Sequence, residues 1–198
     1  MEESVARERN VSIDQAKTEV TARGHTGRIE FYGNLGEYPG YEGLNWRTWK
    51  FEDLDASEKD GALIEIKPGK RTPVELVESD KVFSEVPVDG ESVFLHLDNQ
   101  GKISAYHFDS KRPRDNSFLF EAAKGETFCW VALGQETTKI LEYEEPGFKE
   151  SDLKLIDSGT KEVSGKVIPD ELWKMIEQLE KGKIKDTVVP ILELGNLP

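Results

Sequence analysis

The sequence is poor in cysteine and histidine. Its 198 residues include one cysteine, Cys129, and three histidines. A single cysteine cannot form an internal disulfide, so we expect a reducing compartment and a cytoplasmic location. Three histidines leave few ways to build a serine, histidine and aspartate arrangement, and no such arrangement and no glycine-rich phosphate loop stands out.

Positive charge and long apolar segments are also scarce. The chain has 26 Lys and Arg against 39 Asp and Glu, giving a formal net charge of -13. This charge repels a phosphate backbone and an anionic lipid surface, so we expect no nucleic acid and no membrane as partners. No apolar run approaches the roughly 20 residues that span a bilayer, and no charged-then-apolar leader opens the sequence.

The apolar content is nevertheless sufficient for a folded core. Apolar residues make up 36% of the chain, and nine Phe, five Tyr and four Trp are among them. A chain of this length usually forms one main domain. We place this domain at residues 46–148, between an N-terminal extension at 1–45 and a C-terminal segment at 149–198.

The main domain is predicted to consist of short strands. Residues 46–51 alternate in the two-residue period of a strand with one buried face. Seven further strands are predicted, separated by glycine-containing turns, at residues 62–66, 82–86, 92–98, 103–109, 117–121, 127–133 and 139–143. Short strands at this spacing favour a mainly β domain, either an antiparallel sandwich or a barrel.

The clearest local structure is a hairpin at residues 93–108. Asp98, Asn99 and Gln100 followed by Gly101 fit a three-residue turn closed by a glycine. This register pairs Leu97 with Ile103, so that His96 and His107 point to opposite faces of the hairpin. We expect the more aliphatic face, which carries His107, to be the interior one, where this histidine is either a hydrogen-bonded core residue or a catalytic group.

Segments outside the strands give weaker signals. Ser12 and Gln15 match a capping box, which predicts a helix at residues 13–22. A second helix is predicted at 169–182, and its apolar stripe should pack on the barrel or on a second subunit. The glycine-rich segment 33–43 is predicted to be an ordered loop, whose tyrosines could line a pocket or pack on the surface.

Residues 46–148 resemble the cupin superfamily. The resemblance is carried by Pro68 and Gly69, by Pro73 after a threonine, by Gly125 ahead of Trp130, and by a closing segment at residues 141–148. It implies an antiparallel β-barrel of the double-stranded β-helix or jelly-roll type, with N- and C-terminal helical additions predicted from the flanking segments. It also implies a homodimer, because cupin relatives often pair through edge strands.

The cupin metal motifs are degenerate in this sequence. Gly69, Pro73 and Gly125 match, but the two histidines of the first motif fall on Glu75 and Val77, and its glutamate falls on Lys81 or a neighbour. The histidine of the second motif falls on Phe128 or Cys129. A transition metal needs about three or four converging nitrogen or carboxylate ligands, so we expect no metal and no other cofactor. Glu75, Glu78 and Asp80 could together hold a hard cation through their oxygens. Alternatively, these acids form a solvated strand edge.

Five residues on or beside the strands that carry the cupin site are candidates for ligand binding: Arg71, Glu75, His107, Cys129 and Trp130. The first hypothesis is a metal-free cupin-like protein that binds a small polar ligand or serves as a dimeric binding module. The alternative is an isomerase, epimerase or lyase for a sugar or small acid, with His107 and Glu75 as acid and base. A third hypothesis is an interaction protein that dimerises through its C-terminal helix and tail.

Overall fold

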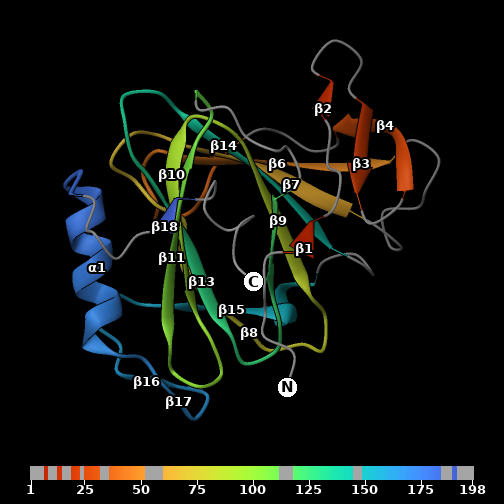
Figure 1. The fold of residues 1–198 in the computed structure, drawn as a ribbon. Helices are drawn as coiled ribbons and strands as arrows, with labels where there is room; N and C mark the ends of the chain where they lie inside the picture. Colours follow the sequence, from red (N-terminus) through yellow and green to blue (C-terminus); the bar gives the residue numbers. More distant parts are fainter. Residues whose placement is uncertain are drawn as a thin grey trace.

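The computed structural model describes residues 7–8, 13–14, 19–22, 25–31, 36–51, 60–111, 118–144, 149–183 and 189–190. In this part of the chain the fold is mainly β, with two large sheets and one α-helix (Figure 1). The fold class predicted from the strand pattern is therefore confirmed.

The larger sheet has ten strands, of which β5 pairs only with β6. In spatial order the other nine are β1 (Arg7–Glu8), β12 (Phe118–Ala122), β9 (Phe83–Asp89), β14 (Thr138–Glu144), β7 (Asp60–Ile66), β6 (Leu44–Phe51), β4 (His25–Phe31), β3 (Glu19–Ala22) and β2 (Ile13–Asp14), and β5 covers Gly36–Glu37. We call this the large sheet.

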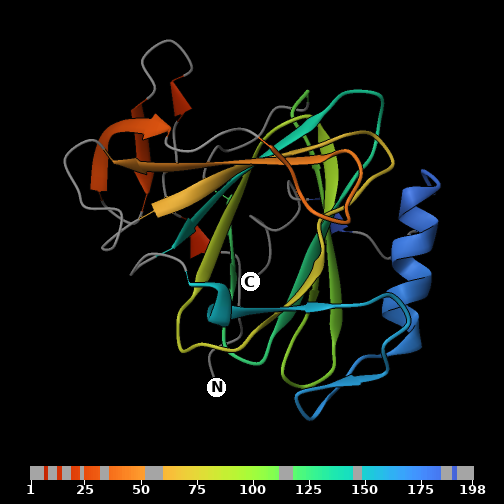
Figure 2. The same cartoon turned by 180° about the vertical axis from the view of Figure 1, so that it is seen from behind.

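The smaller sheet has six strands and faces the large one. Its order is β15 (Leu153–Ile156), β8 (Val74–Val77), β13 (Thr127–Ala132), β10 (Glu91–Leu97), β11 (Ile103–Asp109) and β18 (Val189–Pro190). A short helical turn, η1 (Glu150–Asp152), precedes β15, which runs from there toward the helix (Figure 2, cyan). Among the described residues the two sheets remain separate layers, so the predicted jelly roll is found but a closed barrel is not.

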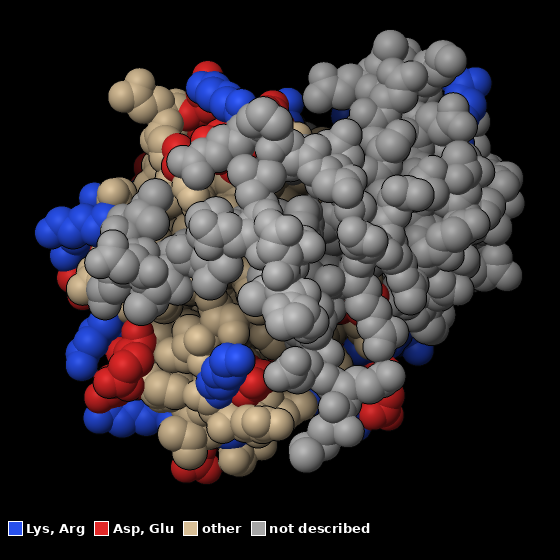
Figure 3. Space-filling view, viewed as in Figure 1, with Lys and Arg blue, Asp and Glu red and all other residues tan. Residues whose placement is uncertain are grey.

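A two-stranded hairpin, β16 (Glu162–Val163) and β17 (Lys166–Val167), leads into the helix α1 (Asp170–Glu180). Pro169 precedes the helix and two acidic residues occupy its first turn, as predicted. In the described part of the chain, no helix is both long and apolar enough to cross a membrane. Figure 3 shows acidic and basic side chains interspersed around α1 and the hairpin on the face in view.

The hairpin of β10 and β11 has the predicted register. Leu97 pairs with Ile103, and the backbone amide of Asp98 donates to the carbonyl of Lys102 at 3.0 Å. Gly101 has a φ of 83°, a conformation that glycine adopts without steric cost. Local turn chemistry was therefore sufficient to align the two strands.

Both faces of the small sheet are buried along β8, β10 and β13, and α1 covers the outer one. The apolar stripe of α1 packs there against β10, β11 and β13, and this outer cluster includes Leu95, Ala105 and Cys129. In the alternation of β11, His107 shares the face of Ala105. His107 is buried and lies within hydrogen-bond distance of Glu91, as expected for a core histidine, but its face packs on the helix and not on the opposite sheet.

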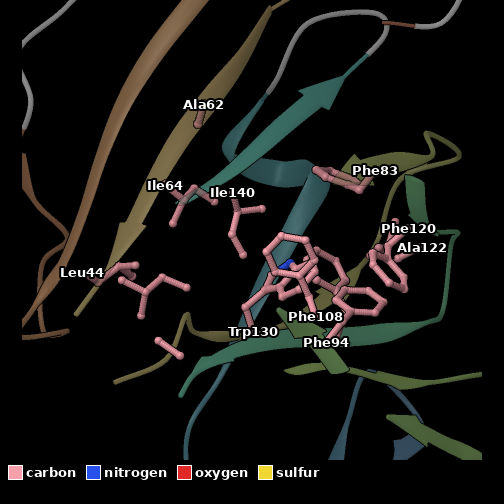
Figure 4. Close-up of a cluster of buried hydrophobic side chains, with 14 residues drawn as sticks. Leu44, Ala62, Ile64, Phe83, Phe94, Phe108, Phe120, Ala122, Trp130 and Ile140 are labelled. Carbon is pink, nitrogen blue, oxygen red and sulfur yellow. The ribbon is translucent and has the colours of Figure 1, made fainter. Parts of the chain in front are cut away.

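The inner faces of the two sheets enclose an aromatic core. Trp130, Phe94 and Phe120 have ring centroids 4.6 to 5.4 Å apart. Figure 4 shows these rings grouped on one side of the core, with aliphatic side chains of the large sheet, including Leu44, Ile64 and Ile140, on the other. The interior is thus filled by aromatic rings at one end and by smaller side chains at the other.

The predicted N-terminal helix is wrong for the described residues. Ile13 and Asp14 form β2, and Glu19 to Ala22 form β3, which pairs with β4. Val20 and Thr21 are β-branched and fit a strand better than a helix. Strand pairing has overridden the capping signal at Ser12, which itself lies outside the described residues.

Candidate functional site

A cavity of about 620 Å³ lies between the two sheets. Strands β6, β7 and β14 of the large sheet and β8 and β15 of the small sheet contribute to its walls, together with the segments before β6 and β8. The lining residues are Tyr38, Pro39, Leu44, Trp46, Thr48, Gly61, Ala62, Ile64, Thr72, Pro73, Glu75, Glu142, Leu153 and Leu155. The cavity occupies the aliphatic end of the interior, where side chains leave space.

Aromatic and aliphatic groups form most of the cavity wall. The ring centroids of Tyr38 and Trp46 are 6.0 Å apart, and the ring planes are inclined at 61°. Tyr38 belongs to the glycine-rich segment for which the sequence predicts possible pocket tyrosines, and it lines the cavity. Trp46 is 36% exposed and Leu155 is 45% exposed, so both are accessible from solvent. Gly61 has no room for a side chain, because a Cβ there would lie 2.7 Å from the indole of Trp49.

Glu75 is a buried acidic residue that faces this cavity. It lies on β8 beside Phe128 of β13 and Leu155 of β15, and it is only 9% exposed. No described residue donates a hydrogen bond to its carboxyl group. Its pKa is well above the ordinary value of 4.5, first because of burial and then because of the negative charges of Glu142 and Glu85.

Two further carboxyl groups approach from the large sheet. Glu142 of β14 and Glu85 of β9 are directly opposite each other in the antiparallel pair, and Glu142 also lines the cavity. Glu85 is deeper, and its carboxylate accepts a hydrogen bond from Nε1 of Trp130. Burial and Glu142 raise the pKa of Glu85 well above 4.5, and the Trp130 hydrogen bond opposes this rise. Glu75 and Glu142 therefore line the cavity from the two sheets, and Glu85 is close enough to act on the charge of Glu75.

Sequence reasoning missed Glu85 and Glu142, although a signal for both exists. Glu85 lies two residues after Phe83, and Glu142 lies two residues after Ile140; both Phe83 and Ile140 are core residues of predicted strands. Because side chains two residues apart share a face of a strand, both glutamates point inward. An acid in phase with the apolar face of a strand is the pattern that could have identified them.

Trp130 and Arg71 do not line the cavity. Trp130 is fully buried in the aromatic core, where its contribution is to hold Glu85. The guanidinium of Arg71 pairs with Glu180 at 3.3 Å, donates to Ser158 Oγ at 2.9 Å and lies 5.5 Å from the ring centroid of Tyr41. Arg71 therefore attaches the end of α1 to the small sheet.

His107 and Glu75 lie on opposite faces of the small sheet. His107 Nε2 is 2.9 Å from Glu91 Oε1 on the outer face, whereas Glu75 points into the cavity. The acid and base pair considered from the sequence requires both groups at one ligand, and this arrangement separates them by the thickness of the sheet. The other hairpin histidine, His96, faces inward, but its Nε2 is 2.9 Å from Glu126 Oε2.

Cys129 is also on the outer face and is fully buried beneath α1. Burial raises the pKa of its thiol to about 12. We expect a chromogenic disulfide reagent to react with Cys129 at least about a hundredfold more slowly in the folded protein than in urea, because the thiolate is both scarce and inaccessible. Equal rates in the two conditions would show that this face opens readily.

The residues at the cupin metal positions do not fit a transition metal. Val77 and Phe128 belong to the apolar inner cluster, and Cys129 points to the opposite face. Lys81 Nζ pairs with Asp152 at 2.5 Å. Glu75 is the one potential ligand at these positions, and among the described residues no three His, Cys, Asp or Glu side chains are grouped as metal ligands.

The hard-cation alternative is not supported either. Glu78 accepts from Ser164 Oγ at 2.5 Å, and Asp80 pairs with Lys124 at 2.9 Å on the surface. Glu75 instead faces the cavity. The three carboxylates proposed from the sequence therefore have separate surroundings and do not converge.

Comparison with known proteins identifies the fold. No protein-family model matches the chain, and no curated protein matches its sequence. Among solved structures, oxalate decarboxylase from Bacillus subtilis is similar over 86% of this chain, with 16% identity and a TM-score of 0.52. Protein SO0799 from Shewanella oneidensis is similar over 79% of this chain and 92% of its own, with 12% identity and a TM-score of 0.52.

Some of these matches cover only a part of the larger protein. The chain spans 38% of oxalate decarboxylase and 34% of the capsular polysaccharide assembling protein CapF from Staphylococcus aureus. The CapF match has 12% identity, a TM-score of 0.49 and covers 65% of this chain. The two-layered antiparallel arrangement, together with the similarity to oxalate decarboxylase and to protein SO0799, shows that the chain has the jelly-roll fold that the sequence resemblance implied.

Proposed function

We propose that this chain is a cupin-fold binding protein that takes a small polar ligand into the cavity between its sheets without using a transition metal. The observation that carries the proposal is Glu75, a buried carboxyl group without a described hydrogen-bond partner at the wall of a 620 Å³ cavity. A ligand that donates a hydrogen bond to this carboxyl group gains free energy on binding, because hydrogen bonds to charged groups contribute about 1.5 to 3 kcal/mol.

The dimensions and lining of the cavity support the same proposal. Small-molecule sites usually have volumes of about 300 to 1,000 Å³ and apolar walls with a few polar groups that orient the ligand. Here Glu75, Glu142, Thr48 and Thr72 are the polar groups, set among aliphatic and aromatic side chains. A homodimer remains a prediction from the cupin resemblance, and the apolar stripe of α1 is used within the chain itself.

A thermal-shift screen tests this proposal. The library contains sugars, polyols, hydroxy acids, amines and small aromatic compounds, each at millimolar concentration. A compound present at about 100 times its dissociation constant should stabilise the protein by about 2.7 kcal/mol. We expect the stabilisation to disappear in Ala62→Leu and in Ile64→Phe, which fill the cavity from β7.

The matched control is Glu65→Gln, which alters β7 on the face opposite Ile64. It should retain the ligand response of the wild type. Circular dichroism checks that the filled variants are folded, and two variants are used so that one failure to fold does not decide the result. Either a library without any stabilising compound or a response that survives in both filled variants contradicts the proposal.

A further inference from the structure

The polar part of the cavity is acidic. Its described lining residues include two carboxyl groups, Glu75 and Glu142, and no lysine, arginine or histidine. Glu85 lies behind them as a third acid. This inference rests on the binding function proposed above: we propose that the ligand is an organic cation, an amine or ammonium compound whose charged group contacts Glu75 and whose apolar part packs against Trp46 and Tyr38.

Charge complementarity is the first argument. A negatively charged ligand would lie beside Glu75, whose own charged form is already disfavoured by burial and by Glu142 and Glu85, so its binding is disfavoured as well. An ammonium group instead supplies both the positive charge and the hydrogen-bond donor that Glu75 lacks. The net charge of -13 attracts a cationic ligand over long distances as well.

The shape and chemistry of the remaining wall are the second argument. Trp46 and Tyr38 form an aromatic corner, and Leu44, Ile64 and Leu153 extend the apolar surface. Aromatic faces attract organic cations as well as hydrocarbon groups. A hydrated inorganic cation makes no favourable contacts with an apolar wall. The arrangement therefore favours an ammonium group attached to a hydrocarbon or aromatic body.

In the protein without ligand, protonation of the Glu75 carboxyl group competes with binding of a cation. The titratable groups around Glu75 are Glu142 on β14, Glu85 on β9, the Cys129 thiol on β13 and the Tyr38 phenol at the cavity wall. With the pKa of Glu75 raised well above 4.5, its carboxyl group retains a proton at mildly acidic pH. A bound ammonium group lowers this pKa, so that binding releases a proton.

A charge series on one scaffold tests the inference. Phenethylammonium, phenethyl alcohol and phenylacetate have closely similar bodies and differ mainly in the charge and chemistry of the terminal group. Isothermal titration calorimetry is performed at about pH 6, 7 and 8, in two buffers with different ionisation enthalpies. We expect phenethylammonium to bind most tightly, to release up to one proton, and to gain up to about tenfold in affinity per pH unit wherever Glu75 is protonated in the free protein.

Variants assign the preference to Glu75. Glu75→Gln should weaken phenethylammonium binding by about tenfold to a hundredfold, which corresponds to a charged hydrogen bond, and should remove most of the pH dependence. Trp46→Ala should weaken all the aromatic probes that bind, since it removes part of the wall. Glu65→Gln, on the outer face of β7, should match the wild type.

The outcomes separate this inference from the binding function itself. Tighter binding of phenethyl alcohol or phenylacetate than of phenethylammonium overturns the cationic ligand, and so does a phenethylammonium affinity that Glu75→Gln leaves unchanged. If no probe binds but the library screen finds a cavity ligand without positive charge, the cationic ligand is wrong and the binding function stands. If the probes and the screen both fail, the two proposals fail together.

Discussion

The free energy of unfolding is expected to decrease as the pH rises from about 5 to about 8. Glu75 and Glu85 have pKa values well above 4.5 in the folded protein, chiefly because both are buried. Their contribution to stability is therefore fully present below 4.5 and is lost as the pH rises through the raised values. The expected slope is about 1.4 kcal/mol per pH unit for each proton that the folded state retains and the unfolded state has lost.

Two other acids produce the opposite dependence at lower pH. Burial is the largest single influence on the pKa of Glu126 and of Asp152 and acts to raise both. The hydrogen bonds from His96 and Lys81 respectively, together with backbone hydrogen bonds and nearby charges, outweigh it in sum, so both pKa values are lowered. Their contribution is present above their ordinary values of 4.5 and 3.8 and is lost as the pH falls through the folded-state values. The maximum of stability should consequently lie at mildly acidic pH.

Urea denaturation at a series of pH values measures this profile. Glu75→Gln and Glu85→Gln should each flatten the decrease above about pH 5, because glutamine carries no charge at any pH. Glutamine at position 85 also retains an oxygen that can accept from Trp130. Glu65→Gln should leave the slope unchanged. Stability that is constant or increasing between pH 5 and 8 in the wild type would contradict the protonation of these buried acids.

Local chemistry explains which parts of the fold the sequence could predict. The turn at Asp98 and Gly101 specifies the β10 and β11 register through hydrogen bonds within a few residues, and the alternation of apolar residues then defines two faces. In α1 the stripe of Leu172, Ile176 and Leu179 and the acidic first turn are equally local signals. These predictions needed no knowledge of distant segments.

The errors arise where distant segments decide the outcome. Both faces of the hairpin are apolar enough to be buried, so alternation alone could not show that the face with His107 packs on α1. The capping box at Ser12 is a local helix signal, whereas Val20 in β3 is held by pairing with β4. Strand β8 was not predicted, because its four residues are buried on both faces and do not alternate in polarity.

The candidate site depends on contacts between the sheets, which the sequence does not reveal directly. Glu75 was identified through its position in a degenerate metal motif, but Glu85 and Glu142 are 10 and 67 residues from it in the chain. They reach it only because the two sheets face each other. Glu75, at a metal-ligand position of the cupin pattern, instead faces the cavity with Glu142 on its wall, and the cationic ligand proposed above rests on this placement.

The largest loss of stability is expected for Trp130→Ala. Trp130 is fully buried, with Phe94 at 4.9 Å and Phe120 at 5.4 Å between ring centroids, so its truncation leaves a large cavity in the aromatic core. Substitutions of this kind cost about 3 to 5 kcal/mol. Trp130→Phe preserves much of the packing but removes the donor to Glu85, and should cost about 1 to 3 kcal/mol.

A double-mutant cycle separates packing from hydrogen bonding in this effect. In a Glu85→Leu background no carboxyl group loses its donor, so Trp130→Phe should cost less there than in the wild type, by about 0.5 to 3 kcal/mol. The Trp130 hydrogen bond favours the ionised form of Glu85 and opposes the rise of its pKa. The cost of Trp130→Phe should therefore increase from about pH 5 to about pH 8 in the wild type and stay constant in the Glu85→Leu background. Equal costs in both backgrounds at every pH would mean that Trp130 stabilises the core through packing alone and has no part in the acid cluster.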